Sequence, residues 1–184
     1  MTTSTLLFSQ TPDWSKLPEG KKTRLGLYMT AQQAAQHMEA EAGKTLFVDV
    51  RTRAEAVFIG MPKVADALVS FADGPQKEWD DKRNGFAMAP NPDFVAQVNG
   101  RLADKKLSKQ DTVILMCRSG DRSARAADLL AEAGYRQVYS LVEGFEGDLA
   151  KDGPRAGQRA VNGWKNAGLP WSYQLEKAKM PLSR

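Results

Sequence analysis

The single cysteine of the chain stands at the start of a loop that is rich in charged and hydroxyl groups. Cys117 follows an apolar run over residues 112–116, and the sequence Arg-Ser-Gly-Asp-Arg-Ser comes directly after it. An alanine-rich pattern with helical spacing begins where this loop ends. A thiol between the end of a strand and the start of a helix lies near converging backbone N–H groups and the positive end of the helix dipole, which favours the thiolate. The spacing therefore predicts a reactive cysteine that acts on an anionic substrate.

The residues that follow Cys117 can bind an anion in complementary ways. Gly120 permits a backbone turn that a side chain would hinder, and a tight loop can point several N–H groups inward. Arg118 and Arg122 can each hold an oxyanion through two parallel hydrogen bonds. The other candidate substrate-binding residues are two hydroxyl donors and an acid that we expect to face outward or to cap the helix: Ser119, Ser123 and Asp121. Together these residues predict an anion cradle around the sulfur.

The composition argues against several other kinds of site. One cysteine cannot form an intramolecular disulfide or a cysteine-rich zinc site. His37 is the one histidine, which leaves little for a histidine-based metal site or a Cys–His pair. We therefore expect no metal and no cofactor, and we interpret His37 as a partly solvated helix residue. The net charge of +4, without any long basic run, also argues against a nucleic-acid partner.

The hydropathy pattern bears on the compartment. No stretch approaches the ~20 apolar residues of a membrane span, so no membrane partner is expected. The apolar patch near the N-terminus, Leu6-Leu7-Phe8, is too short for the apolar core of a signal peptide, which needs about 7–15 residues. We expect a cytoplasmic protein as the chain stands, or a periplasmic one if a signal peptide has been removed.

Strand-like and helix-like segments alternate through most of the 184 residues. Apolar runs predict strands over residues 25–28, 45–50, 67–71, 112–116 and 137–142. The alternation with helices predicts one α/β domain whose central sheet is mainly parallel, with helices on both faces. In such sheets ligands bind beyond the carboxyl ends of the strands, which is where Cys117 is expected to lie.

The predicted helices are marked by capping signals. Thr30 with Gln33, and Thr52 with Glu55, have the spacing of capping boxes. Further helices are predicted from Asn91-Pro92-Asp93, with proline at the first helical position, over about 122–133, and near 160–167. The expected divisions are an N-terminal arm over 1–24 anchored by Trp14, one domain over 25–171 with insertions near 72–110 and 146–162, and a polar tail over 172–184.

The long segment over residues 72–90 carries three large apolar side chains, Trp79, Phe86 and Met88. They can either form a lid over the cysteine or anchor the segment to the core. Because anchoring is the commoner role of such residues in a long loop, we expect them to pack against the core.

Several segments, in this order along the chain, resemble the rhodanese-like sulfurtransferase family. The loop Cys117–Ser123 matches the active-site loop of that family. Residues 47–55 resemble its Asp-Val-Arg stretch with the glutamate that follows, and residues 131–139 resemble the helix, turn and strand after the loop. Residues 142–145 and 163–170 resemble its C-terminal Gly-Gly, Trp and Ala-Gly-Leu-Pro pattern. The resemblance implies a single rhodanese-like domain.

The resemblance also implies a mechanism. The Cys117 thiolate would take a sulfane sulfur from an anionic donor such as thiosulfate, form a persulfide, and pass the sulfur to cyanide, a thiol or a protein cysteine. The acceptor must be external, since the chain has no second cysteine. Arg118 beside the nucleophile suits a doubly charged donor. Asp49 and Arg51 would support the site: Asp49 by holding a neighbouring loop, and Arg51 through its charge or, as we expect, through a salt bridge with Glu55.

Two alternatives to a sulfurtransferase stay open from the sequence. A cysteine phosphatase or arsenate reductase of related fold would place one more residue between the cysteine and the arginine than the four that separate Cys117 from Arg122. A sulfur carrier or binding module that depends on a partner would keep the same loop without turnover of its own.

Overall fold

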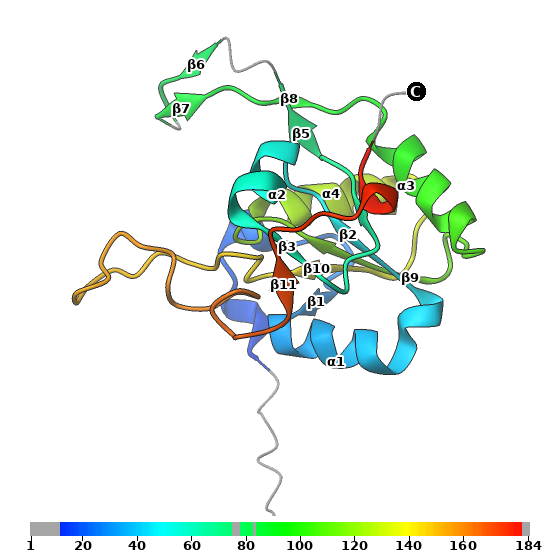
Figure 1. Cartoon of the computed structure of the whole chain (residues 1–184), viewed down its shortest axis with the longest axis horizontal. Helices are drawn as coiled ribbons and strands as arrows, with labels where there is room; N and C mark the ends of the chain where they lie inside the picture. The colour runs from blue at the N-terminus through cyan, green and yellow to red at the C-terminus, as the bar shows by residue number, and fades with distance from the viewer. Residues whose placement is uncertain (1–11, 75–77, 83, 182–184) are drawn as a thin grey trace, which may run out of the picture.

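The computed structural model describes residues 12–74, 78–82 and 84–181. Its centre is a five-stranded sheet with the order β1-β10-β9-β2-β4, in which all neighbouring strands are parallel (Figure 1). In that order the strands are Tyr28–Met29, Val138–Leu141, Thr112–Met116, Thr45–Asp49 and Ala67–Leu68. The α/β fold with a parallel central sheet is thus confirmed.

Helices cover both faces of the sheet (Figure 1). The longer helices are α1 (Ala31–Glu41), α3 (Phe94–Asp104) and α4 (Asp121–Glu132), and α2 (Arg53–Ile59) is shorter. Side chains of successive strand residues point to opposite faces. Leu46 of β2 therefore joins the core under α3 and α4, whereas Phe47 joins the core under α1. Because both faces are covered, β2 is buried along its whole length, which explains the three successive apolar residues at its centre.

The register of the two central strands positions the site. Asp49 at the end of β2 pairs with Met116 at the end of β9. Cys117 and Arg51 therefore lie just beyond the same edge of the sheet, although 66 positions separate them in the sequence (117 − 51).

Both predicted capping boxes are present. Thr52 Oγ1 accepts the N–H of Glu55 at 3.1 Å, and Glu55 Oε2 accepts the N–H of Thr52 at 3.0 Å. The same reciprocal pair forms between Thr30 and Gln33 at the start of α1. These local contacts place α2 directly after β2 and hold Glu55 in its first turn.

The third helix begins later than the sequence predicts. Asp93 is its N-cap, so Pro92 lies in the preceding turn rather than at the first helical position. Asn91 stabilises that turn, because its Oδ1 accepts the N–H of Asp93 at 3.0 Å. The predicted strand over residues 67–71 is likewise shortened to its first two residues.

The helix expected near residues 160–167 does not form. Gly163 has a φ of 98°, which is outside the helical region. The Asn166 side chain donates to the carbonyls of Asn162 and Glu146, each at 2.8 Å. These bonds hold the segment as a series of turns.

The segment over residues 72–90 forms two short antiparallel ladders. One pairs β5 (Ala72–Asp73) with β8 (Ala89–Pro90), and the other pairs β6 (Trp79–Asp80) with β7 (Gly85–Phe86). Trp79 and Phe86 are 55% and 53% exposed, and their rings pack together with centroids 5.5 Å apart. The expectation that these two residues anchor the segment to the core is therefore wrong. The β6–β7 hairpin projects away from the sheet (Figure 1).

Smaller elements join the ends of the chain to the domain. A third ladder pairs β3 (Met61–Pro62) with β11 (Trp171–Ser172). The 3-10 helices are η1 (Trp14–Lys16), η2 (Glu19–Lys21), η3 (Ala42–Lys44) and η4 (Lys177–Lys179). Trp14 packs against Tyr28 with ring centroids 5.6 Å apart. The first eleven residues of the expected arm, and Leu6-Leu7-Phe8 among them, lie outside the described residues.

None of the helices in the described part of the chain has the length and apolar character that crossing a bilayer requires.

Candidate active site

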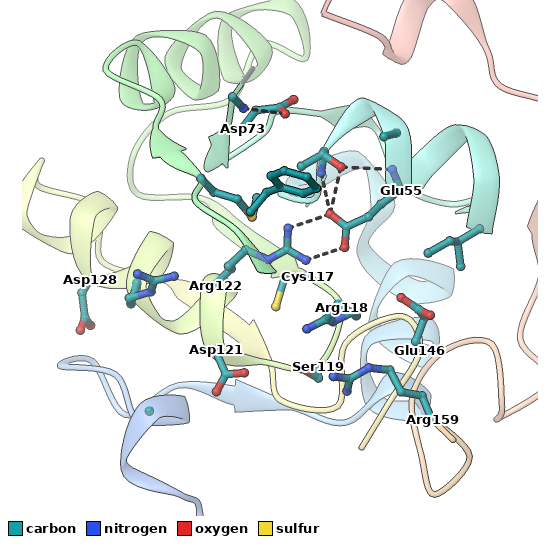
Figure 2. Close-up of a pocket in the computed structure, with 18 of the residues that line it drawn as sticks. Glu55, Asp73, Cys117, Arg118, Ser119, Asp121, Arg122, Asp128, Glu146 and Arg159 are labelled. Atoms are coloured by element: carbon teal, nitrogen blue, oxygen red, sulfur yellow. Dashed lines mark hydrogen bonds and ion pairs between the residues drawn. The ribbon is translucent and has the colours of Figure 1, made fainter. Parts of the chain in front are cut away.

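Cys117 lies at the base of an open cavity of about 860 Å³ (Figure 2). The residue is only 1% exposed, yet it lines this cavity. Its Sγ accepts the backbone N–H of Gly120 at 3.1 Å, and Ser123 Oγ lies 3.6 Å from the sulfur. A sulfur atom that accepts a backbone N–H at the start of a helix is placed to carry negative charge.

Gly120 makes this arrangement possible. It is the N-cap of α4 and has a φ of 106°, which side chains disfavour. A Cβ atom at this position would lie 2.3 Å from the carbonyl oxygen of Val142. Ser123 holds the loop in place, because its Oγ donates to the Gly120 carbonyl at 2.9 Å and shares a hydrogen bond with Ser140 Oγ at 2.9 Å. The turn predicted from the sequence is therefore built by glycine and held by serine.

Arg122 is engaged by Glu55 rather than free for a substrate. Nη1 donates to Oε2 at 2.7 Å and Nη2 donates to Oε1 at 2.5 Å. Burial alone would raise the pKa of Glu55, but the hydrogen bonds and charge of Arg122 outweigh it and lower this pKa to about 2. Burial would likewise lower the pKa of Arg122, and Glu55 raises it above its ordinary value. The pair ties α2 to the cysteine loop (residues 117–123) on one side of the cavity.

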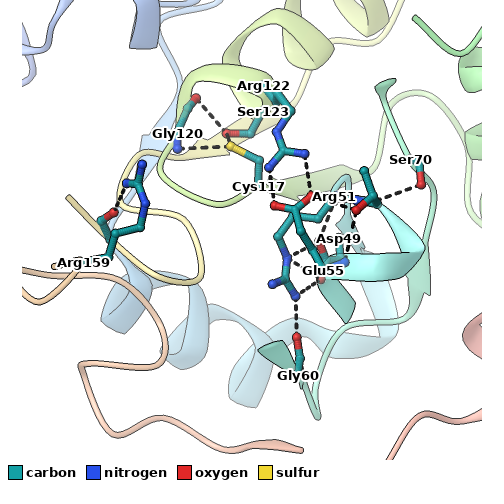
Figure 3. A network of polar contacts seen from close by, with 12 residues as sticks. Asp49, Arg51, Glu55, Gly60, Ser70, Cys117, Gly120, Arg122, Ser123 and Arg159 are labelled. Carbon is teal, nitrogen blue, oxygen red and sulfur yellow. Dashed lines mark hydrogen bonds and ion pairs between the residues drawn. The ribbon is translucent and has the colours of Figure 1, made fainter. Parts of the chain in front are cut away.

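Arg51 forms a second, fully buried pair with Asp49 (Figure 3). Arg51 Nε donates to Oδ1 at 3.0 Å, and Nη2 donates to Oδ2 at 2.6 Å and to the Gly60 carbonyl at 2.7 Å. The guanidinium also lies 4.2 Å from the centroid of the Phe145 ring. The expected salt bridge between Arg51 and Glu55 is therefore wrong, since each residue has a different partner.

These contacts show which elements Asp49 and Arg51 hold together. Burial would lower the pKa of Arg51, but the charge and hydrogen bonds of Asp49 outweigh it and raise this pKa. Through the Gly60 carbonyl, the buried cation reaches the end of α2. The pair thus joins the end of β2 to the C-terminal end of the helix that carries Glu55.

The other residues of the cysteine loop lie at different depths. Arg118 is exposed and lines the cavity, and within the described residues its side chain makes no hydrogen bond or ion pair. Ser119 is 7% exposed and also lines the cavity. Asp121, the first residue of α4, is exposed and also lines the cavity. Arg118 is therefore the loop cation that is available to an anion.

Some cavity residues were not identified from the sequence. Glu146 and Arg159 come from the insertion over residues 146–162, and both line the cavity. They lack any recognisable motif, and only the position of their insertion next to the glycine after β10 could have drawn attention to them. Phe86 and Met88, from the segment that could form a lid, also line the cavity.

The described residues contain no group of three or more His, Cys, Asp or Glu side chains placed to hold a metal ion.

A family model for the rhodanese-like domain matches residues 30–151, which run from the N-cap of α1 into the insertion over residues 146–162. The chain belongs to the rhodanese-like family. The matched region holds the whole cysteine loop and both arginine–carboxylate pairs.

Known relatives support the same assignment. The uncharacterized protein RP600 of Rickettsia prowazekii is 36% identical over 107 residues, which make up 53% of this chain and 77% of that protein. Thiosulfate sulfurtransferase 16 of Arabidopsis thaliana, a chloroplastic protein, is 35% identical over 71 residues, or 39% of this chain and 54% of that protein. The family is thus of the sulfurtransferase type.

A solved structure extends the likeness to most of the fold. The crystal structure of Rv0390 from M. tuberculosis matches with a TM-score of 0.59 and 30% sequence identity, covering 79% of this chain and 96% of that chain.

Proposed function

We propose that this protein is a sulfurtransferase that moves a sulfane sulfur from an anionic donor, such as thiosulfate, to an external acceptor through a persulfide on Cys117. The observation that carries the proposal is the contact between Cys117 Sγ and the N–H of Gly120 at 3.1 Å, at the base of an open cavity. This contact gives a nucleophilic sulfur both access to a small substrate and a fixed donor for its negative charge.

In the first step the Cys117 thiolate attacks the outer sulfur of the donor. A new S–S bond forms to Cys117 while the S–S bond within thiosulfate breaks, and the electron pair of the broken bond leaves with sulfite. The enzyme then holds a persulfide anion, and the total charge is unchanged. The positive end of the 12-residue helix α4 stabilises this anion, because Gly120 orients the first turn toward the sulfur.

In the second step an external nucleophile takes the outer sulfur of the persulfide. The attacking lone pair forms the new bond, and the electrons of the persulfide bond return to Cys117 as thiolate. With cyanide the product is thiocyanate, and with a thiol it is a new persulfide. A cavity of about 860 Å³ is large enough for a small organic thiol as well as for cyanide. A protein cysteine on an exposed segment is a further possible acceptor.

The test is thiocyanate formation from thiosulfate and cyanide by the wild-type protein and by Cys117→Ser. The serine variant keeps the size of the side chain and the Gly120 contact but removes the nucleophilic sulfur. We expect loss of all measurable transfer with an unchanged circular dichroism spectrum. Transfer at the wild-type rate by Cys117→Ser would show that the nucleophile is wrongly assigned.

The same assay separates the alternatives. Turnover by the isolated chain supports an enzyme, whereas transfer only after a partner protein is added indicates a carrier. Phosphate release from an aryl phosphate, without thiocyanate formation, would instead indicate a phosphatase. The engagement of both Arg122 outer nitrogens by Glu55 speaks against that last outcome, because a phosphoryl group would find no free guanidinium there.

A further inference from the structure

The insertion over residues 146–162 is fastened to the cysteine loop at its base. Its first two residues donate their N–H groups to the carbonyl of Arg118, at 3.0 and 3.2 Å. At its other end Asn162 closes the base, because its Oδ1 accepts the N–H of Asp148 at 2.9 Å and its Nδ2 donates to Asp148 Oδ2 at 3.1 Å. The base of the insertion is therefore positioned together with the loop that carries the sulfur.

Arg159 projects from this base into the cavity that holds Cys117. Its Nη1 donates to the Gly147 carbonyl at 2.6 Å. Gly147 has no room for a side chain, since a Cβ atom there would lie 1.8 Å from the Asn162 carbonyl oxygen. One guanidinium nitrogen is thus held by the backbone. The remaining nitrogens make no hydrogen bond or ion pair among the residues that the structure describes.

The positively charged guanidinium groups of Arg118 and Arg159 therefore line the same cavity. Figure 2 shows Arg118 and Arg159 on the same side of Cys117, with Glu146 near them. Burial, and next the charge of Arg118, lower the pKa of Arg159. The carboxylates of Glu146, Asp148 and Asp121 act in the opposite direction but do not cancel this effect. Two neighbouring cations, one exposed and one half-buried, that have no ion-pair partner among the described residues attract an anion, because the anion relieves their mutual repulsion.

We propose that Arg159 and Arg118 together form an oxyanion subsite that binds the sulfonate end of the sulfur donor. The inference rests on the proposed function and adds to it a substrate-binding residue from outside the cysteine loop. While the outer sulfur of thiosulfate meets Cys117, its three oxygens face the two guanidinium groups. When the S–S bond breaks, sulfite leaves with both negative charges still beside the arginines. The insertion thereby makes the enzyme selective for doubly charged donors.

The test compares two donors with the same transferable sulfur and different charge. Thiosulfate carries two negative charges, and benzenethiosulfonate carries one. In Arg159→Gln we expect the KM for thiosulfate to rise about tenfold and that for benzenethiosulfonate to rise no more than about threefold, since a charge-assisted contact is lost mainly by the dianion. We expect kcat to stay within about twofold, because binding and not the chemistry at Cys117 is weakened.

Arg155→Gln is the matched control. Arg155 belongs to the same insertion but is exposed and does not line the cavity. Its loss should leave the KM for both donors unchanged. Arg159→Lys should recover part of the affinity for thiosulfate, because the charge is kept. An unchanged KM for thiosulfate in Arg159→Gln, or an equal rise for both donors, would overturn the proposal.

A binding measurement separates this inference from the proposed function. Calorimetric titration of thiosulfate into Cys117→Ser requires no sulfur transfer, and adding Arg159→Gln should lower the affinity about tenfold. Equal affinities of the single and double variants would contradict the subsite even if the wild-type enzyme transfers sulfur. A wild-type protein that never gains sulfur from either donor would contradict the proposed function and leave the calorimetric result to decide on the subsite.

Discussion

The inner wall of the cavity and its outer rim use arginine in opposite ways. Arg122 on the inner wall and Arg51, buried behind it, are each bonded to a carboxylate, at 2.5 and 2.6 Å. On the rim Arg118 and Arg159 have no carboxylate partner within the described residues, and they lie close enough to influence each other. Of these four arginines, only the rim pair has charge to offer an anion.

The difference separates structure from substrate binding. A buried arginine that loses its carboxylate leaves an uncompensated charge in a poorly solvated site, which is strongly destabilising. An exposed arginine keeps its hydration and costs little when it stands alone. The inner pairs should therefore hold the cavity together, and the rim pair should determine what enters it. Removing charge from each region tests this division of roles directly.

The largest expected effect is on stability, in Glu55→Gln. Glutamine keeps the capping box with Thr52 but leaves Arg122 without a counter-charge, and the two side chains are only 17% and 12% exposed. We expect the free energy of unfolding to fall by about 2–3 kcal/mol, measured by urea denaturation.

The matched control for this change is Glu132→Gln. Glu132 pairs with Arg24 on the surface, where the side chains are 50% and 66% exposed, so its loss should cost less than about 1 kcal/mol. Equal losses in the two variants would mean that the inner pair contributes no more than a surface salt bridge.

The pH dependence of stability tests the same ion pair. Because the pKa of Glu55 is lowered to about 2 from its ordinary value of 4.5, the folded state favours its ionised form. The stabilisation is complete above pH 4.5 and is lost as the pH falls from 4.5 towards 2. Urea midpoints of the wild type should drop across this window more than those of Glu55→Gln. Parallel acid profiles would contradict the assigned role of the pair.

Arg118→Gln is expected to have the smallest effect on stability. It should instead weaken the binding of thiosulfate. Since the side chain is exposed and unpaired among the described residues, the free energy of unfolding should stay within about 0.5 kcal/mol. The KM for thiosulfate should rise about tenfold, as measured by initial rates of thiocyanate formation. A large loss of stability with an unchanged KM would show that Arg118 supports the structure and does not bind the donor.

Features set by neighbouring residues were predictable from the sequence. The capping boxes at Thr30 and Thr52 formed as predicted, because each needs only residues three positions apart. The turn at Gly120 between strand and helix was also predictable, since few residue types tolerate its conformation. The family resemblance and the position of Cys117 rest on such local signals.

Features set by distant residues were not predictable in the same way. Glu55 lies four positions from Arg51, yet it pairs with Arg122. Arg51 instead forms its ion pair with Asp49 in the core. Arg159 reaches the cavity only through the folding of its insertion around Gly147. Helical spacing alone could not reveal that asparagine side chains would hold residues 160–167 in turns.

The central claim is that Cys117 accepts a sulfur atom from a small anionic donor. Its most direct test is the intact mass of the wild-type protein after incubation with thiosulfate and removal of excess donor, followed by peptide mapping. The account predicts a mass increase of one sulfur atom, located on Cys117 and removed by cyanide. A mass that does not change, or a sulfur atom carried at any other residue, would contradict it.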